Sequence, residues 1–172
     1  MGKPPTTPYA PDVDDDAEPV EELGDVVDAI VSGADWANQR ARRAVLRRVE
    51  LTDCRLTGAE LAEAALSDVT LNGCRLELAG MRMARLERVV FRDCQMGECD
   101  LYGAVLKDVL FERCALRGAT LTGATMNRVE LRACDLSDVL GAEALRGARM
   151  PFADMIENGP LFASALGIQA LD

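Results

Sequence analysis

A five-residue repeat constrains the fold of this 172-residue chain more than any other feature of its sequence. From Leu46 to Leu136, every fifth residue is leucine, methionine or phenylalanine, and the residue two places before each of them is alanine, valine or cysteine. An α-helix repeats every 3.6 residues and a strand every 2 residues, so neither has this period. The repeat fits a chain that turns a corner every five residues, buries two of each five side chains and exposes the other three.

A second period of 20 residues, or four pentapeptides, is superposed on the first. From Val49 onward the small residues run valine, cysteine, alanine, alanine, and only Cys99 departs from this order. We interpret the pattern as a square coil with one pentapeptide per side, stacked at the strand spacing of about 4.8 Å, so that residues 34–140 form about five coils. One interior column then holds small residues: Cys54, Cys74, Cys94, Cys114 and Cys134. A central column holds large ones: Leu51, Leu71, Phe91, Phe111 and Leu131.

The exposed positions support the same stacking independently. Five residues spaced by 20 alternate in charge, and we call them the charge ladder: Arg48, Asp68, Arg88, Asp108 and Arg128. Stacked coils would bring opposite charges together along one edge of the rod. Exposed pairs of this kind contribute about 0.2–1 kcal/mol each, so the ladder is expected to set the register more than the stability.

The uninterrupted tandem motif of a small residue, a polar residue, Leu, Met or Phe and two polar residues resembles the pentapeptide-repeat family. The resemblance covers residues 34–138 and implies an all-β solenoid, the right-handed quadrilateral β-helix of that family, with both columns filling its interior. Gln39 and Ala41 occupy the two inward places of their pentapeptide, so the first coil is expected to be imperfect.

The two ends of the array are expected to be covered, because an open solenoid end exposes unpaired strand edges. Apolar residues at helical spacing predict an amphipathic capping helix over residues 18–33. Residues 1–17, rich in proline and aspartate, are expected to be disordered. Residues 141–172 are expected to form an irregular last turn and a helical C-terminal cap, in which Gly167 ends a short apolar helix. The resemblance suggests that this helix mediates a homodimer through three residues: Leu161, Phe162 and Leu166.

The composition argues against catalysis. The chain has no histidine, which removes the commonest general base and any imidazole metal ligand. No catalytic residue, metal ligand or cofactor site is predicted, and a rod without long loops offers no concave pocket. The cysteine column could be a thiolate metal ladder or a redox device, but we favour the interpretation that cysteine is a small buried space-filler.

The distribution of charged and of exposed apolar residues limits the kinds of partner that this chain is expected to bind. Residues 1–33 carry nine acidic side chains against Lys3, while the rest of the chain is nearly neutral, so direct nucleic-acid binding is not expected. Three outward apolar residues form a candidate partner patch: Val90, Leu110 and Val105. The alternative is that they are scattered surface hydrophobes without a partner. We expect a cytoplasmic protein with no membrane association, because the chain has neither a long apolar run nor a secretory signal.

These observations favour a non-enzymatic, rigid scaffold that acts through protein–protein interaction. The resemblance suggests a more concrete alternative, a DNA-mimicking inhibitor or protector of DNA gyrase that confers quinolone or toxin resistance. A DNA mimic should display continuous negative stripes, whereas a scaffold need not.

Overall fold

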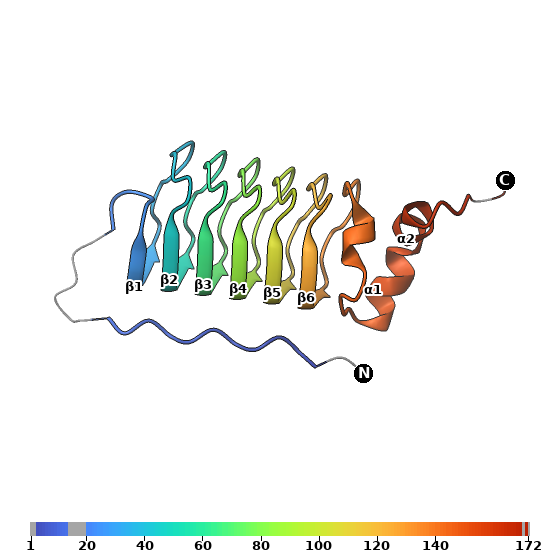
Figure 1. The fold of residues 1–172 in the computed structure, drawn as a ribbon, viewed down its shortest axis with the longest axis horizontal. Helices are drawn as coiled ribbons and strands as arrows, with labels where there is room; N and C mark the ends of the chain where they lie inside the picture. Colours follow the sequence, from blue (N-terminus) through green and yellow to red (C-terminus); the bar gives the residue numbers. More distant parts are fainter. Residues whose placement is uncertain (1–2, 14–19, 170, 172) are drawn as a thin grey trace.

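The structure is a computed structural model that describes residues 3–13, 20–169 and 171. Its core is one parallel sheet in which six strands follow each other in chain order, each paired with the next (Figure 1). The strands are β1 (Val26–Ser32), β2 (Val45–Thr52), β3 (Ala65–Asn72), β4 (Arg85–Arg92), β5 (Val105–Glu112) and β6 (Thr125–Arg132). Three short helices follow: η1 (Ala142–Leu145), α1 (Phe152–Glu157) and α2 (Gly159–Ala165).

The register between neighbouring strands is 20 residues throughout, as the sequence predicts. Leu46 pairs with Leu66, which pairs with Leu86, and the same step continues to Leu106 and Met126. Isolated parallel bridges repeat this step on other parts of the coil, as in Arg55 with Arg75 and Glu60 with Gly80. The chain is therefore a parallel β-solenoid of about five turns.

The corners of the coil fall at the last residue of every pentapeptide. From Asp28 to Asp138 every fifth residue has a positive φ, and most of these residues are not glycine. Gly73 shows why glycine helps at some corners: a Cβ there would lie 2.5 Å from Oδ1 of Asp53, one coil before it. The five-residue period is thus a period of left-handed corner residues, with four to each coil.

Both predicted interior columns are buried. Leu51, Leu71, Phe91, Phe111 and Leu131 belong to the hydrophobic core, and the rings of Phe91 and Phe111 stack with centroids 5.0 Å apart and planes within 4°. Four of the five column cysteines are buried, while Cys134 in the last full coil is half-buried. The small and large columns interdigitate to fill the rod.

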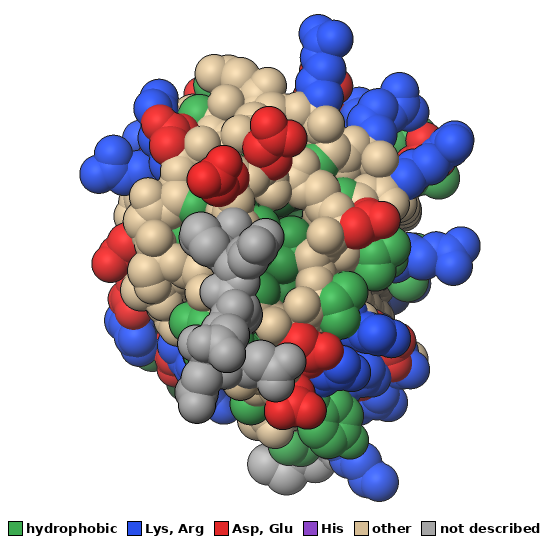
Figure 2. Space-filling model, turned by 90° about the vertical axis from the view of Figure 1, so that its left-hand side faces the viewer, with side chains coloured by type: hydrophobic (Ala, Val, Ile, Leu, Met, Phe, Trp, Pro, Cys, Tyr) green, Lys and Arg blue, Asp and Glu red, His purple; other side chains and the backbone are tan. Residues whose placement is uncertain are grey.

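The predicted N-terminal capping helix is wrong, because residues 26–32 form β1 and pair with β2 from Val26↔Leu46 to Ser32↔Thr52. Val26 and Val31 take the large inward places, so the array begins ten residues before residue 34. Both side chains are β-branched, which favours a strand over a helix. The end of the rod is covered instead by residues 20–23: the Trp36 indole N–H donates to Glu21 O at 3.1 Å, and the Leu23 N–H donates to Gln39 Oε1 at 2.7 Å. Figure 2 looks onto this end, where Lys and Arg side chains project around the rim among Asp and Glu.

The N-terminal segment, residues 3–13, belongs to the tail that the sequence predicts to be disordered. In the structure it forms neither helix nor strand, and it runs as an extended chain across the strands from the β6 end back toward β1 (Figure 1). The remainder of the predicted disordered tail, residues 1–2 and 14–17, lies outside the described residues.

The C-terminal end follows the prediction closely. Helices η1, α1 and α2 close this end of the rod, and Gly167, two residues after the end of α2, has φ 74°. The Ile168 N–H donates to Ala163 O at 2.8 Å and the Gly167 N–H donates to Ser164 O at 2.9 Å. These two bonds form the Schellman stop that the sequence predicts.

Candidate functional site

The charge ladder is a column of two-pronged ion pairs. Each aspartate binds the arginine one coil later: Arg88 Nε and Nη2 lie 2.7 and 2.9 Å from the two carboxylate oxygens of Asp68, and Arg128 binds Asp108 in the same way at 2.6 Å for both contacts. Arg48 pairs with Asp28, which adds a sixth member to the ladder. The predicted alternation of charge is therefore an alternation of bonded pairs, with one pair for every two coils.

The aspartates of the ladder are more buried than the sequence suggests. The side chains of Asp68 and Asp108 are only 8% and 3% exposed. The side chains of Arg88 and Arg128, which cover them, are 23% and 36% exposed. A buried carboxylate must be fully hydrogen-bonded, since an unsatisfied one costs the whole desolvation free energy of the group. Each of these carboxylates therefore needs a partner in addition to its arginine.

The N-terminal segment supplies that partner three times. The backbone N–H groups of Thr6, Tyr9 and Asp12 donate to Oδ1 of Asp108, Asp68 and Asp28 at 3.0, 3.1 and 3.1 Å. The Thr6 hydroxyl adds a 3.2 Å hydrogen bond to Asp108, and the Arg88 guanidinium lies 5.7 Å from the centroid of the Tyr9 ring. Four hydrogen bonds thus tie the N-terminal segment to three strands of the rod, β5, β3 and β1.

These contacts also set the ionisation of the ladder. Hydrogen bonds from Arg48 and then from the Asp12 N–H lower the pKa of Asp28 to about 2. Hydrogen bonds from Arg128 and from Thr6 lower the pKa of Asp108 to about 2 against the opposing effect of burial, and Arg88 lowers the pKa of Asp68. The aspartates of the ladder therefore stay ionised at neutral pH, and as carboxylates they accept hydrogen bonds from N–H groups.

The predicted partner patch is not a continuous exposed surface. Val90 is only 5% exposed, because Thr70 and Leu110 flank it in register on both sides. Leu110 is half-buried and only Val105 is exposed. The prediction that Val90 faces solvent is wrong.

The cysteine column is buried in a hydrogen-bonded stack. Each thiol lies near two backbone carbonyls, as Cys94 Sγ does at 3.5 Å from Leu71 O and 3.2 Å from Arg92 O. Hydrogen bonding to its neighbour Cys114, and then to Cys74 and burial, raise the pKa of Cys94, and burial raises the pKa of Cys99 to about 12. No group of three or more metal-ligating side chains occurs in the part of the chain that the structure describes.

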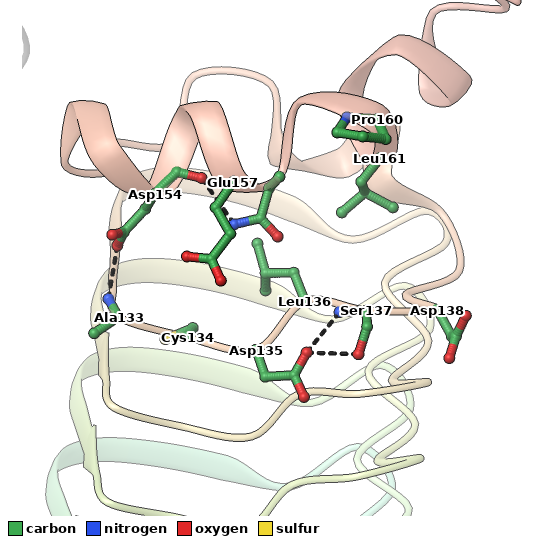
Figure 3. Close-up of a pocket in the computed structure, with 11 residues that line it drawn as sticks. Ala133, Cys134, Asp135, Leu136, Ser137, Asp138, Asp154, Glu157, Pro160 and Leu161 are labelled. Carbon is green, nitrogen blue, oxygen red and sulfur yellow. Dashed lines mark hydrogen bonds between the residues drawn. The ribbon is translucent and has the colours of Figure 1, made fainter. Parts of the chain in front are cut away.

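A cavity of about 840 Å³ lies between the last coil and the helices α1 and α2 (Figure 3). Four carboxylates line it: Asp135, Asp138, Asp154 and Glu157. Asp154 accepts the Ala133 N–H at 2.7 Å, and Asp135 accepts the N–H and hydroxyl of Ser137. Two of the carboxylates are therefore used to fasten the local backbone, and Asp135 also holds the Ser137 hydroxyl in a hydrogen bond between two exposed side chains.

The C-terminal cap exposes apolar side chains. Phe152 is 75% exposed and Leu166 is 72% exposed, and Ile156 and Ile168 are exposed beside them in the sequence. A cavity of about 310 Å³ lies between η1 and α2 and is lined by Met150, Met155, Phe162 and Leu166 among others. Of the predicted dimer residues, Leu161 and Phe162 pack partly against the core, and only Leu166 is fully available.

The fold and these surfaces define a repeat solenoid with an extended segment docked along one edge. A family model for the pentapeptide repeat region matches residues 44–121, and this part of the chain belongs to that family. No curated protein sequence matches the chain. No helix among the described residues is long and apolar enough to cross a membrane.

Two solved structures share the solenoid. A pentapeptide repeat protein from the thylakoid lumen of Arabidopsis thaliana is 24% identical with a TM-score of 0.55, and the match covers 58% of this chain and 69% of that one. A trypsin-treated variant of QnrB1, a plasmid-mediated fluoroquinolone resistance protein, is 15% identical with a TM-score of 0.54 over 87% of this chain and 96% of that one. Both likenesses concern the fold.

Proposed function

We propose that this chain is a non-enzymatic scaffold that acts through protein–protein contacts, and that a second copy docks on its C-terminal cap. The rod is taken to be right-handed and four-sided, like the family it belongs to, and it serves as a rigid spacer. Its walls are covered by ion pairs between stacked coils, such as Arg92 with Glu112 and Lys107 with Glu87. Surfaces of this kind are well hydrated and make weak contacts with other proteins.

The observation that carries the proposal is the exposed apolar surface of the cap. Phe152, Ile156, Leu166 and Ile168 lie within 17 residues of one another and are all exposed. Clustered apolar side chains that face water mark sites of protein association. A symmetric dimer would bury the same patch on both copies.

The oligomeric state tests this proposal directly. Sedimentation velocity over a concentration series should show a dimer for the unmodified protein and a monomer for F152S/I156S. Because both side chains are already exposed, these substitutions leave the core intact. The control variant L78S/M83S removes two exposed apolar side chains from the rod and should remain a dimer. An unmodified protein that stays monomeric at the highest soluble concentration would contradict the proposal.

A second candidate is an inhibitor or protector of DNA gyrase that mimics DNA. It is favoured by the net charge of −10. Against it, each aspartate of the ladder is paired with arginine, so this edge lacks a continuous negative stripe. Titrating the full-length protein into a gyrase supercoiling reaction decides the matter: inhibition or protection would support this candidate, and no effect on the enzyme or on its inhibition by quinolones would remove it.

A further inference from the structure

The spacing of the N-terminal segment matches the spacing of the ladder. Successive aspartates of the ladder are 40 residues apart, which is two coils or about 9.6 Å at the strand spacing. Three residues of polyproline II helix rise about 9.3 Å and complete one turn. A segment in this conformation therefore presents every third N–H on the same side, at the interval of the carboxylates.

The sequence of the segment is built for this conformation. Pro5, Pro8 and Pro11 recur every third residue and are half-buried, whereas the side chains of the two residues that follow each of them are exposed. Proline fixes φ near the polyproline II value and has no N–H of its own, so the segment loses little conformational entropy on docking. Each tripeptide thus has one residue that packs, one that donates and one that faces water.

The rod contributes a fixed row of acceptors. The guanidinium groups of Arg88 and Arg128 hold both oxygens of their carboxylates, which leaves Oδ1 of Asp68 and of Asp108 oriented toward the segment. Hydrogen bonds to an ionised carboxylate are stronger than those between neutral groups. Because the donors are backbone N–H groups, recognition depends on the position of the prolines more than on the other side chains.

We infer that the charge ladder is a binding site for extended peptides in the polyproline II conformation that carry proline at every third residue. The N-terminal segment occupies the site within the same chain and closes it to other peptides. An attached segment competes at an effective concentration on the order of millimolar, so a peptide from a partner protein binds appreciably only when it exceeds that competition. This inference goes beyond the proposed scaffold function, since the site shares no residue with the C-terminal cap.

A variant that vacates the site provides the receptor for the test. In T6P/Y9P/D12P the segment loses its three donors and keeps its extended conformation, whereas T7P/A10P/V13P gains as many prolines and keeps the donors. The probe is a fluorescent synthetic peptide with the sequence of residues 3–13. A matched probe carries N-methyl groups at the positions of Thr6, Tyr9 and Asp12, and a control probe carries them at Thr7, Ala10 and Val13.

Fluorescence anisotropy should show the unmodified probe binding T6P/Y9P/D12P at least about tenfold more tightly than T7P/A10P/V13P, since each of three hydrogen bonds contributes a factor of about two to ten. The control probe should bind like the unmodified one, and the probe methylated at the donors should lose binding. Equal binding of the two methylated probes, or no binding to the vacated variant, would overturn the inference. Circular dichroism of both variants checks the fold, and their oligomeric state reports on the cap separately.

Discussion

Thr6 and Asp108 lie 102 residues apart in the sequence, and the backbone N–H of Thr6 donates a 3.0 Å hydrogen bond to a carboxylate oxygen of Asp108. This bond ties the start of the chain to the fifth strand of the solenoid. The parallel bonds of Tyr9 to Asp68 and Asp12 to Asp28 follow at regular intervals toward β1. A segment and a rod with different periods therefore meet in register along three bonds.

The first prediction concerns the pair of Arg88 and Asp68. Substituting Arg88→Met keeps the length of the side chain and removes its charge, so the mostly buried Asp68 loses its main partner. We expect the free energy of unfolding in urea to fall by about 1–3 kcal/mol. Arg113→Met is the matched control, because Arg113 and Asp93 form an equally regular pair with both side chains more than half exposed. Equal losses in the two variants would contradict the importance of burial.

The second prediction concerns the stability of the protein at acidic pH. The pKa values of Asp28 and Asp108 are lowered to about 2 from an ordinary value of 3.8. A lowered pKa in the folded state stabilises the protein above the unfolded value, and this stabilisation is lost as the pH falls from about 4 through about 2. Urea midpoints between pH 5 and pH 2 should therefore decrease, and Asp108→Asn should show a shallower decrease. The same slope in both proteins would exclude Asp108 as a source of the acid sensitivity.

The third prediction concerns the thiols. Cys134 is half-buried while the other five cysteines are buried, and burial raises the pKa of Cys99 to about 12, so little thiolate forms there at neutral pH. A thiol reagent should modify one cysteine of the folded protein early and all six only after unfolding. Cys134→Ala should abolish the early phase. Several equally fast thiols in the folded protein would instead favour a functional cysteine column.

The fourth prediction concerns the stacked rings of the central column. Phe91 and Phe111 are parallel with centroids 5.0 Å apart, and leucine occupies the same place in other coils. Each single Phe→Leu substitution should therefore destabilise the rod, and the two should be coupled by about 0.5–1.5 kcal/mol in a double-mutant cycle. Additive losses in urea unfolding would show that the stacking itself contributes nothing beyond burial.

The interior of the rod could be predicted from the sequence because the repeat assigns every residue a place. Once the 20-residue step is known, the partners of Leu71 or Asp68 follow by addition: Leu71 pairs with Phe91, and Asp68 pairs with Arg88. The same rule predicted an exposed Val90, and it was wrong there because a second-place residue between Thr70 and Leu110 is covered by its in-register neighbours. The position of a residue in the pentapeptide determines whether its side chain points inward or outward. Its exposed fraction also depends on the size of the in-register side chains one coil before and one coil after.

The two ends were harder to predict for physical reasons. Val26, Val27, Ile30 and Val31 satisfy a helical spacing, but Val26 and Val31 also satisfy the inward places of a coil, and the available edge of β2 favours the strand. The N-terminal segment carries a signal in its three evenly spaced prolines. That signal becomes meaningful only when the rise of two coils is compared with one turn of polyproline II, which requires the register of the rod.

The last prediction tests the docking of the N-terminal segment in the unmodified protein. Amide hydrogen exchange should be slow at Thr6, Tyr9 and Asp12, whose N–H groups are bonded to the ladder, and fast at Thr7 and Ala10, which are exposed. The pattern should therefore repeat every third residue. Asp68→Asn weakens only the middle acceptor and should speed exchange most at Tyr9. Uniformly fast exchange across residues 3–13 would show that the segment does not dock, whereas uniformly slow exchange would show a contact other than the periodic one seen here.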